Sequence, residues 1–293
     1  VETELWPNFL RAIRERHIPV MMVNGRISEK SVKTYRYLYG IWDDMLSTVS
    51  RFCMQSSIDA DYIYSLGADK NKIFVTGNTK FDQTYAEVTP EDYARYKEEL
   101  GLNDSYPIIM AGSTHPGEEK ALFDAFKKVR EKYADARLVI APRKTNRADE
   151  ISKQASSYGY ETGYRSKMLE NPNLRKAYPV VLLDTIGELG RIYAVGDVVF
   201  VGGSLCKTGG HNVLEPAAHA KPIIVGPNMQ NFKDSYSLLS KVGACKMINN
   251  VAELANEMID IIGSDERREK MGAASLQVIK ENRGADIRSI HYL

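Results

Sequence analysis

The chain has 293 residues, of which 43% are hydrophobic and 26% charged, and it carries a formal net charge of +1 at pH 7. This length allows one large or two smaller α/β domains, and the near-neutral charge excludes a general electrostatic attraction to nucleic acid. The cysteines, Cys53, Cys206 and Cys245, are far apart in sequence, which argues against disulfides and a structural zinc and for a reducing compartment. No apolar run approaches the about 20 residues that a membrane-spanning helix requires.

The beginning of the chain indicates a missing N-terminal part. Val1 stands where a complete protein would have methionine, and VETELWP is typical of a strand end that runs directly into a helix. We therefore expect further residues before residue 1, including any targeting or anchoring segment.

Short apolar runs alternate with helical patterns along the whole chain. Eight runs are predicted to be strands: residues 20–23, 52–54, 73–75, 108–110, 138–141, 180–183, 197–201 and 222–225. They are continuously apolar rather than alternating, as expected for parallel strands covered on both faces. Between them, patterns such as residues 118–133 place apolar side chains on one stripe of a helix. This alternation predicts an α/β fold of doubly wound, Rossmann-like sheets.

A domain boundary is predicted near residues 83–105, where the regular succession of apolar runs is interrupted by a polar, acidic helical pattern. Residues 1–85 then form the later part of one domain, and residues 86–275 form a complete α/β unit. A C-terminal helix at residues 276–293 can return to the first domain.

The glycine-rich segment at residues 202–216, GGSLCKTGGHNVLEP, carries the most specific signal. It follows a predicted strand and leads into a helical pattern that opens at His211–Asn212 and carries Glu215. Glycine allows close approach of the backbone, and the N–H groups and dipole of a helix start favour an anion. A carboxylate one turn into the helix is well placed to accept hydrogen bonds from ribose hydroxyls. The segment therefore predicts a nucleotide or sugar-nucleotide ligand.

Polar loops follow three other predicted strands as well. They are AGSTHPGEE after residues 108–110, PRKTNR after 138–141 and DTIGELG after 180–183. Ligands of open α/β sheets bind beyond the carboxyl ends of the strands, so four such loops predict a cleft for a polar ligand. Arg143 can clamp a phosphate through two parallel hydrogen bonds, although a surface salt bridge is the alternative.

Two of these loops also allow a purely structural interpretation. Ser113 precedes a helix start at Pro116–Gly117 and can cap it or contact the ligand. Asp184 or Thr185 can form a capping box with Glu188, or the same helix start can present its N–H groups to a base or ribose.

Two patterns suggest a metal site, but neither is convincing. His211 and His219 lie eight residues apart without a third ligand at a fitting spacing. Asp59 and Asp61 have the D-x-D shape of metal-dependent glycosyltransferases, but residues two apart on a helix do not share a face. We expect neither a metal nor another cofactor.

The first predicted domain contains a basic, aromatic stretch at residues 26–42, RISEKSVKTYRYLYGIW. It is expected to be an amphipathic helix packed on the sheet, with a surface for phosphorylated lipid headgroups as the alternative. Glu2, at a strand end, can be polar or catalytic, and Lys80 can be a surface lysine or a point charge for an anion.

Six motifs occur in order along the chain and together resemble the Kdo transferases, which attach 3-deoxy-D-manno-octulosonic acid to the lipid A precursor of Gram-negative bacteria. The motifs are ETELWPN (2–8), GNTKFD (77–82), GSTHPGEE (112–119), APR (141–143), DTIGELG (184–190) and GGHNVLEPAA (209–218). The resemblance implies a glycosyltransferase-B architecture, in which two Rossmann-like domains face a cleft. The N-terminal domain then takes the lipid acceptor, at the cytoplasmic side of the inner membrane, and the C-terminal domain takes the CMP-Kdo donor.

The resemblance also implies roles for single residues. The expected CMP contacts are Pro142, Arg143, Gly187, Glu188, Leu189, Asn212, Val213, Leu214 and Glu215. Strand-end position alone adds Ser113, Gly209 and Gly210. Glu2 and Lys80 match positions that the family assigns to transition-state stabilisation. The family's general base, a glutamate near the start of the full protein, has no match and is expected before residue 1.

One departure from the family pattern concerns Lys144, which stands where members commonly have histidine. Lysine keeps a positive charge near the phosphate but lacks the imidazole geometry. Two alternatives to an inverting Kdo transferase stay open. One is another nucleotide-sugar transferase or epimerase of the same fold, and the other, for this chain alone, is a donor-binding module without turnover.

Overall fold

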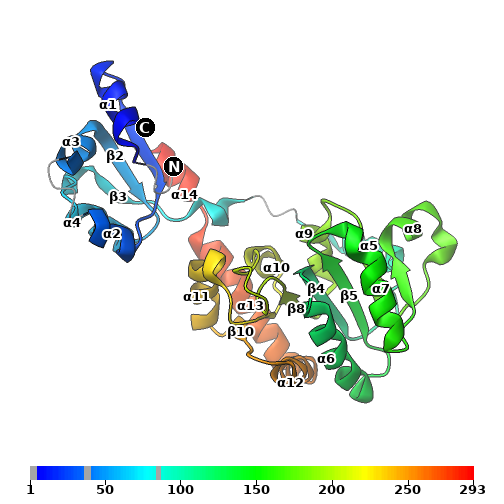
Figure 1. Cartoon of the computed structure of the whole chain (residues 1–293). Coiled ribbons are helices and arrows are strands. Elements are labelled where there is room, and N and C mark those ends of the chain that lie inside the picture. Colours follow the sequence, from blue (N-terminus) through cyan, green and yellow to red (C-terminus); the bar gives the residue numbers. More distant parts are fainter. Residues whose placement is uncertain (1–4, 36–40, 84–86) are drawn as a thin grey trace. The chain divides into compact units, whose positions relative to one another are not determined.

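The computed structural model describes residues 5–35, 41–83 and 87–293 (Figure 1). The chain divides into two compact units, one of Val1–Thr84 with Lys280–Leu293 and the other of Tyr85–Ile279. The divisions fall at 84/85 and 279/280, against 85/86 and 275/276 expected from the sequence.

The smaller unit contains a three-stranded parallel sheet of order β1-β2-β3. Its strands are β1 (Val20–Gly25), β2 (Val49–Met54) and β3 (Ile73–Val75). Its helices are α1 (Pro7–Glu15), α2 (Glu29–Tyr35), α3 (Ile41–Thr48), α4 (Ser57–Ser65) and α14 (Ala285–Ile290), with 3-10 turns η1 (Lys70–Lys72) and η2 (Thr79–Asp82). The core gathers side chains from β2 and the helices, among them Phe52, Met54 and Ile63.

The C-terminal segment belongs to this smaller unit through specific hydrogen bonds. The Asp82 carboxylate accepts from the backbone N–H of Gly284 at 2.5 Å, just before α14. Arg288 donates to the carbonyl of Thr76 at 2.7 Å, and the hydroxyls of Ser289 and Thr76 lie 3.1 Å apart. Residues more than 200 positions apart thus close the unit.

Within the basic, aromatic stretch 26–42, the structure forms α2 and the beginning of α3, and residues 36–40 lie outside the described part. Ile27 and Val32 are buried in the core of the smaller unit, as the packed-helix interpretation expects. Ser56 caps the start of α4 by accepting from the N–H of Asp59, and the Asp59 carboxylate accepts from the N–H of Ile27 and from the Ser56 hydroxyl.

The larger unit is built on a seven-stranded parallel sheet of order β10-β9-β8-β4-β5-β7-β6. The strands are β4 (Ile108–Thr114), β5 (Arg137–Pro142), β6 (Thr162–Tyr164), β7 (Val180–Leu182), β8 (Val198–Val201), β9 (Ile223–Val225) and β10 (Cys245–Met247). The main helices are α5 (Pro90–Glu99), α6 (Glu118–Lys132), α7 (Ala148–Ser157), α8 (Arg165–Glu170), α9 (Leu189–Ile192), α10 (Leu214–Ala218), α11 (Lys233–Lys241), α12 (Val251–Ile262) and α13 (Asp265–Asn282). Short 3-10 turns are η3 (Thr145–Arg147), η4 (Pro172–Leu174), η5 (Tyr193–Val195) and η6 (Gln230–Phe232).

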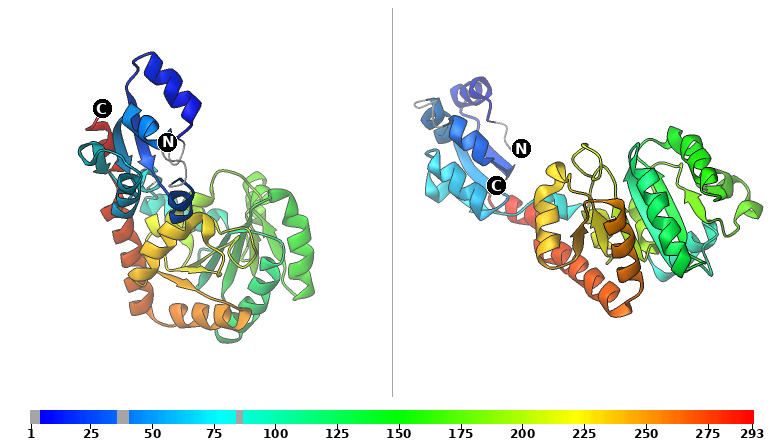
Figure 2. Two further views of the ribbon diagram at one scale, coloured as in Figure 1. Left: turned by 60° about the vertical axis from the view of Figure 1, so that its left-hand side comes forward. Right: turned by 60° about the horizontal axis from the view of Figure 1, so that its bottom comes forward.

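Helices pack around this sheet (Figure 2), and the core lies between them and the strands. The predicted stripe of α6 is buried, with Phe123 and Phe126 fully enclosed. The parallel α/β fold and all eight predicted strands are confirmed, as one full Rossmann-like sheet and a smaller partial one. None of the helices in the described ranges combines the length and apolar content needed to cross a bilayer.

Candidate nucleotide-binding site

The four polar loops follow four strands that are neighbours in the larger sheet, in the order β8-β4-β5-β7. All four strands are parallel, so their carboxyl ends lie at one edge. The chain passes from β4 to β5 on one side and later returns to β8 on the other. The crevice between β4 and β8 is therefore the topological switch point, where open α/β sheets bind ligands.

The backbone at this switch point is tightly packed. Ser113 lies in β4 at a register shift and has a left-handed φ of 56°. A Cβ at Gly202, after β8, would lie 2.5 Å from the Ser113 carbonyl oxygen, so glycine is needed there. Gly117, not Ser113, is the N-cap of α6, and the capping interpretation of Ser113 is wrong.

A buried carboxylate accepts hydrogen bonds from the first half of the glycine-rich segment. Glu118, 1% exposed, accepts from the N–H groups of Gly203 at 2.8 Å, Ser204 at 3.0 Å and Leu205 at 2.9 Å. It also accepts from the N–H of His115 at 2.9 Å. The expectation that these loop amides point at a ligand phosphate is therefore wrong for residues 203–205, because an internal anion already takes them.

The second half of the segment turns back and begins a helix later than expected. Gly209 and Gly210 have φ angles of 97° and 78°, which favour glycine. The helix α10 begins at Leu214 rather than at His211, and it has five residues. Asn212 explains this start, because its side-chain oxygen accepts from the N–H of Leu214 at 3.0 Å, which leaves Asn212 outside the helix.

Glu215 lies in the first turn of α10 with few partners. Asn212 donates to its carboxylate at 3.2 Å. Burial raises the pKa of the Glu215 carboxyl, and the bond from Asn212 opposes that shift. A carboxylate that is largely enclosed and accepts one side-chain hydrogen bond keeps acceptor capacity for a ligand's hydroxyl groups.

The loop after β7 meets the loop after β8. His219 bonds the carbonyl of Gly190 at 2.6 Å, and a Cβ at Gly190 would be 3.7 Å from the Glu215 carboxylate. The predicted residues 187–189 and 212–215 are therefore brought to one place. His219 has a structural role here, and no group of three or more His, Cys, Asp or Glu side chains in the described residues could hold a metal.

The side chain of Glu188 already has partners within the protein. Arg165, 2% exposed, donates to the Glu188 carboxylate at 3.1 Å and to Glu99 at 2.7 Å. Thr185 donates to the same carboxylate. The predicted capping box is not formed with Asp184 or Thr185, because Glu188 itself is the N-cap of α9, and Asp184 accepts from Ser166. The neighbouring Gly187 is exposed and has a left-handed φ of 91°.

The loop after β5 supplies the predicted phosphate clamp. Pro142 is buried at the end of β5, and the Arg143 side chain is exposed. The backbone N–H of Arg143 donates to the Thr114 carbonyl at 3.0 Å, which fixes it next to the switch point. Sequence reasoning missed Arg147, which pairs with buried Glu119 at 2.7 Å and holds this loop to α6.

The two remaining predicted residues belong to the smaller unit or fall outside the described part. Lys80 lies in η2, where its backbone N–H donates to the side chain of Asn78 at 2.9 Å. Glu2 lies outside the described residues.

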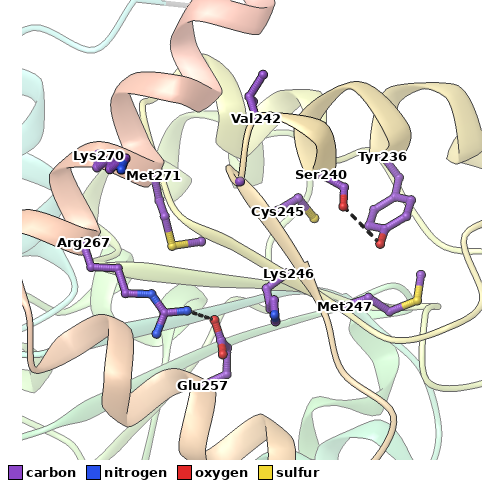
Figure 3. A pocket seen from close by; sticks show the side chains of 11 residues that line it. Tyr236, Ser240, Val242, Cys245, Lys246, Met247, Glu257, Arg267, Lys270 and Met271 are labelled. Atoms are coloured by element: carbon purple, nitrogen blue, oxygen red, sulfur yellow. Dashed lines mark hydrogen bonds and ion pairs between the residues drawn. The ribbon is translucent and has the colours of Figure 1, made fainter.

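A separate pocket of about 480 Å³ lies beside the edge strand β10 (Figure 3). None of the predicted donor residues lines it. Its arginine, Arg267, is already paired with Glu257. The candidate site is therefore the carboxyl edge of the sheet, where the polar loops converge, and this pocket is not part of it.

Solved structures of nucleotide-sugar proteins share this fold. Anabaena HepE in complex with UDP-glucose has a TM-score of 0.54 at 13% identity, covering 97% of this chain and 73% of that chain. A UDP-N-acetylglucosamine 2-epimerase from Listeria monocytogenes has a TM-score of 0.54 at 17% identity, covering 90% and 64%. These likenesses show the fold alone, an α/β protein with parallel sheets and glycosyltransferase-B-like structural neighbours.

A more similar structure is the C-terminal CMP-Kdo binding domain of WaaA from Acinetobacter baumannii. It has a TM-score of 0.58 and 26% identity, covering 65% of this chain and 97% of that domain. A family model described as 3-deoxy-D-manno-octulosonic-acid transferase matches residues 1–83.

Curated relatives point the same way. A 3-deoxy-D-manno-octulosonic acid transferase of Haemophilus influenzae is 33% identical, covering 97% of this chain and 66% of the relative. One from Bordetella pertussis is 29% identical, covering 100% and 67%. The chain belongs to the Kdo transferase family, and it spans about two thirds of the length of these relatives.

Proposed function

We propose that this chain binds CMP-Kdo at the carboxyl edge of its larger sheet, and that the whole protein transfers Kdo to the lipid A precursor with inversion. The observation that carries the proposal is the convergence of the loops after β5, β7 and β8 in a unit similar to a CMP-Kdo binding domain. This is a step of lipopolysaccharide core biosynthesis.

In the proposed complex, each of three loops contacts a different part of CMP. Arg143 binds the phosphate, because a guanidinium offers two parallel donors to phosphate oxygens. Glu215, oriented by Asn212, accepts hydrogen bonds from the ribose hydroxyls. The backbone of residues 187–189 borders the base, while the Glu188 side chain stays with Arg165.

The transfer requires a base to take the acceptor's proton and cations to stabilise the CMP phosphate as it leaves. Arg143 and Lys80 supply the cations in this proposal, Glu2 assists at the transition state, and the base comes from the glutamate expected before residue 1. Activity of the full-length protein should then survive EDTA. Complete loss of turnover, restored by magnesium, contradicts that expectation.

The acceptor is proposed to be reached at the cytoplasmic face of the inner membrane, through the domain to which the smaller unit belongs. Co-sedimentation of the full-length protein with vesicles that contain lipid A precursor tests this placement. Equal binding to neutral phosphatidylcholine vesicles would count against it.

Calorimetric titration of the chain with CMP and UDP tests the donor assignment. We expect CMP to bind and UDP to bind at least about tenfold more weakly, a difference of about 1.4 kcal/mol. Arg143→Gln should weaken CMP binding, while Arg130→Gln, at the far end of α6, should not. Preference for UDP supports a UDP-sugar enzyme instead, as the shared fold of HepE allows.

A Kdo-transfer assay of residues 1–293 tests the division of labour between this chain and the residues before it. Binding of CMP-Kdo without turnover is the expected result. Measurable turnover contradicts the placement of the general base before residue 1.

A further inference from the structure

Two histidines from loops far apart in sequence meet at the switch point. The Nε2 atoms of His115, after β4, and His211, after β8, lie 2.7 Å apart. The rings are nearly parallel, with an interplanar angle of 10° and centroids 5.0 Å apart. One ring must therefore donate to the other across the crevice in which the nucleotide is proposed to bind.

Both histidines are held in place by their surroundings. The backbone N–H of His115 donates to the buried Glu118 carboxylate at 2.9 Å. The His211 ring lies against Gly203, where an added Cβ would come within 2.8 Å of its Cδ2 atom. Both residues remain partly exposed.

The charges around the pair are mostly positive. Burial, together with the neighbouring His115 and Arg143, lowers the pKa of His211 to about 4. Among the described residues, no carboxylate bonds either imidazole ring. The carboxylates of this region are committed elsewhere, Glu118 to four backbone N–H groups and Glu119 to Arg147. Lys144, beside Arg143, is exposed and adds a further cation.

We propose that the His115–His211 pair takes up one proton from solvent when the phosphate of the nucleotide enters the switch-point crevice. In the neutral pair, the Nε2–H of one ring donates to the Nε2 of the other, and the Nδ1 of the donating ring is a lone pair. The added proton goes to that Nδ1 and leaves the Nε2–Nε2 bond intact. The pair then carries two Nδ1–H donors and one positive charge. This inference rests on the proposed donor site and adds a proton-linked contact to it.

The physical reason is linkage between an anion and a titrating pair. A neighbouring anion raises the pKa of an imidazole by about 1–3 units. Because the pKa of His211 starts at about 4, the pKa of the bound pair is raised toward neutral pH. Binding is then accompanied by proton uptake, and affinity rises as the pH falls toward the pKa of the bound pair.

The test is calorimetric titration of the chain with CMP at pH 7.5 in two buffers of different ionisation enthalpy. A phosphate monoester with a second pKa of about 6 is already almost fully ionised at this pH, so CMP itself takes up no proton. We expect uptake of up to about two tenths of a proton per CMP bound. Cytidine, which lacks the phosphate, should bind without uptake.

Two variants assign the proton. His115→Gln and His211→Gln should each still bind CMP but abolish the uptake, and His17→Asn, an exposed histidine of the smaller unit, should leave it unchanged. The difference from wild type separates the histidines from other titrating groups such as Glu215. Thermal denaturation shows whether each variant is folded. If His211→Gln is unfolded, comparison of His115→Gln with the wild type decides whether the pair takes up the proton.

The outcomes separate the two proposals. CMP binding without proton uptake overturns the role of the histidine pair and leaves the donor site standing. Uptake that persists in both variants also overturns it. Absence of CMP binding overturns both.

Discussion

Glu118 and Glu215 lie near the same sheet edge at the starts of helices α6 and α10, but their environments are opposite. Glu118 is 1% exposed, and four backbone N–H groups satisfy its carboxylate. Glu215 accepts one side-chain bond, from Asn212, and burial raises the pKa of its carboxyl. Both residues were part of motifs that suggested ligand binding.

The difference separates a carboxylate that builds the site from one that is left for a ligand. The Glu118 carboxylate already accepts from the N–H groups of residues 203–205, so an incoming phosphate must bind elsewhere. Glu215 carries the cost of burial without full compensation, which a ribose could supply. An acidic residue in a nucleotide motif therefore has to be judged by how many donors already reach it.

The largest expected effect comes from Glu118→Gln. The amide nitrogen of glutamine cannot accept, so two of the four N–H groups lose their partner in a buried place. We expect the free energy of unfolding to fall by about 2–5 kcal/mol, measured by urea denaturation. Glu131→Gln, an exposed position on the same helix, should change it by less than about 0.5 kcal/mol. Equal stability of the two variants would contradict the structural role given to Glu118 in contrast to Glu215.

Arg165→Met extends the comparison to a third carboxylate, Glu188. The substitution leaves Glu99 and Glu188 without their shared cation, and because both carboxylates are about a fifth exposed, water recovers part of the loss. We expect about 2–4 kcal/mol less stability by urea denaturation, together with weaker CMP binding. Arg165→Lys should fall between, because an ammonium cannot span both partners equally well. Unchanged stability and affinity would show that the ion pairs do not hold the loop after β7.

Glu215→Ala tests the ligand side of the comparison. Loss of a charged acceptor for the ribose hydroxyls should weaken CMP binding by about 1–3 kcal/mol, or about 5- to 150-fold, in calorimetry. Glu131→Ala serves as the control. An unchanged affinity removes Glu215 from the site.

The smallest effect concerns the stability of the unliganded chain. Because the folded-state pKa of Glu215 is raised, the folded chain binds more protons than the unfolded chain, and the ionised carboxylate costs stability. Glu215→Gln should therefore stabilise the chain slightly at pH 7, by less than about 1 kcal/mol, and the gain should disappear below pH 4.5. Thermal unfolding at both pH values checks this. A gain at pH 4 as large as at pH 7 contradicts the cause given.

The sequence predicted the central strands because each is a continuous apolar run buried on both faces. It missed β6 and β10, the two edge strands of the larger sheet, because TGY and CKM are short and partly polar. Edge strands pair on one side only and need less apolar character.

The sequence also located the loops of the site but not their partners. The glycine-rich segment itself does not show that Glu118, 85 residues earlier, accepts hydrogen bonds from the first backbone N–H groups of the segment. The same holds for His115 and His211, which are 96 residues apart, and for Arg165 with Glu99, 66 apart. Such contacts depend on strand order, which single motifs do not determine.

A crystal structure of the chain bound to CMP tests the central claim most directly. The account predicts CMP at the carboxyl edge of β5, β7 and β8, with its phosphate at Arg143 and its ribose hydroxyls hydrogen-bonded to Glu215. CMP in the pocket beside β10, or at the carboxyl edge without contact to Glu215, contradicts it.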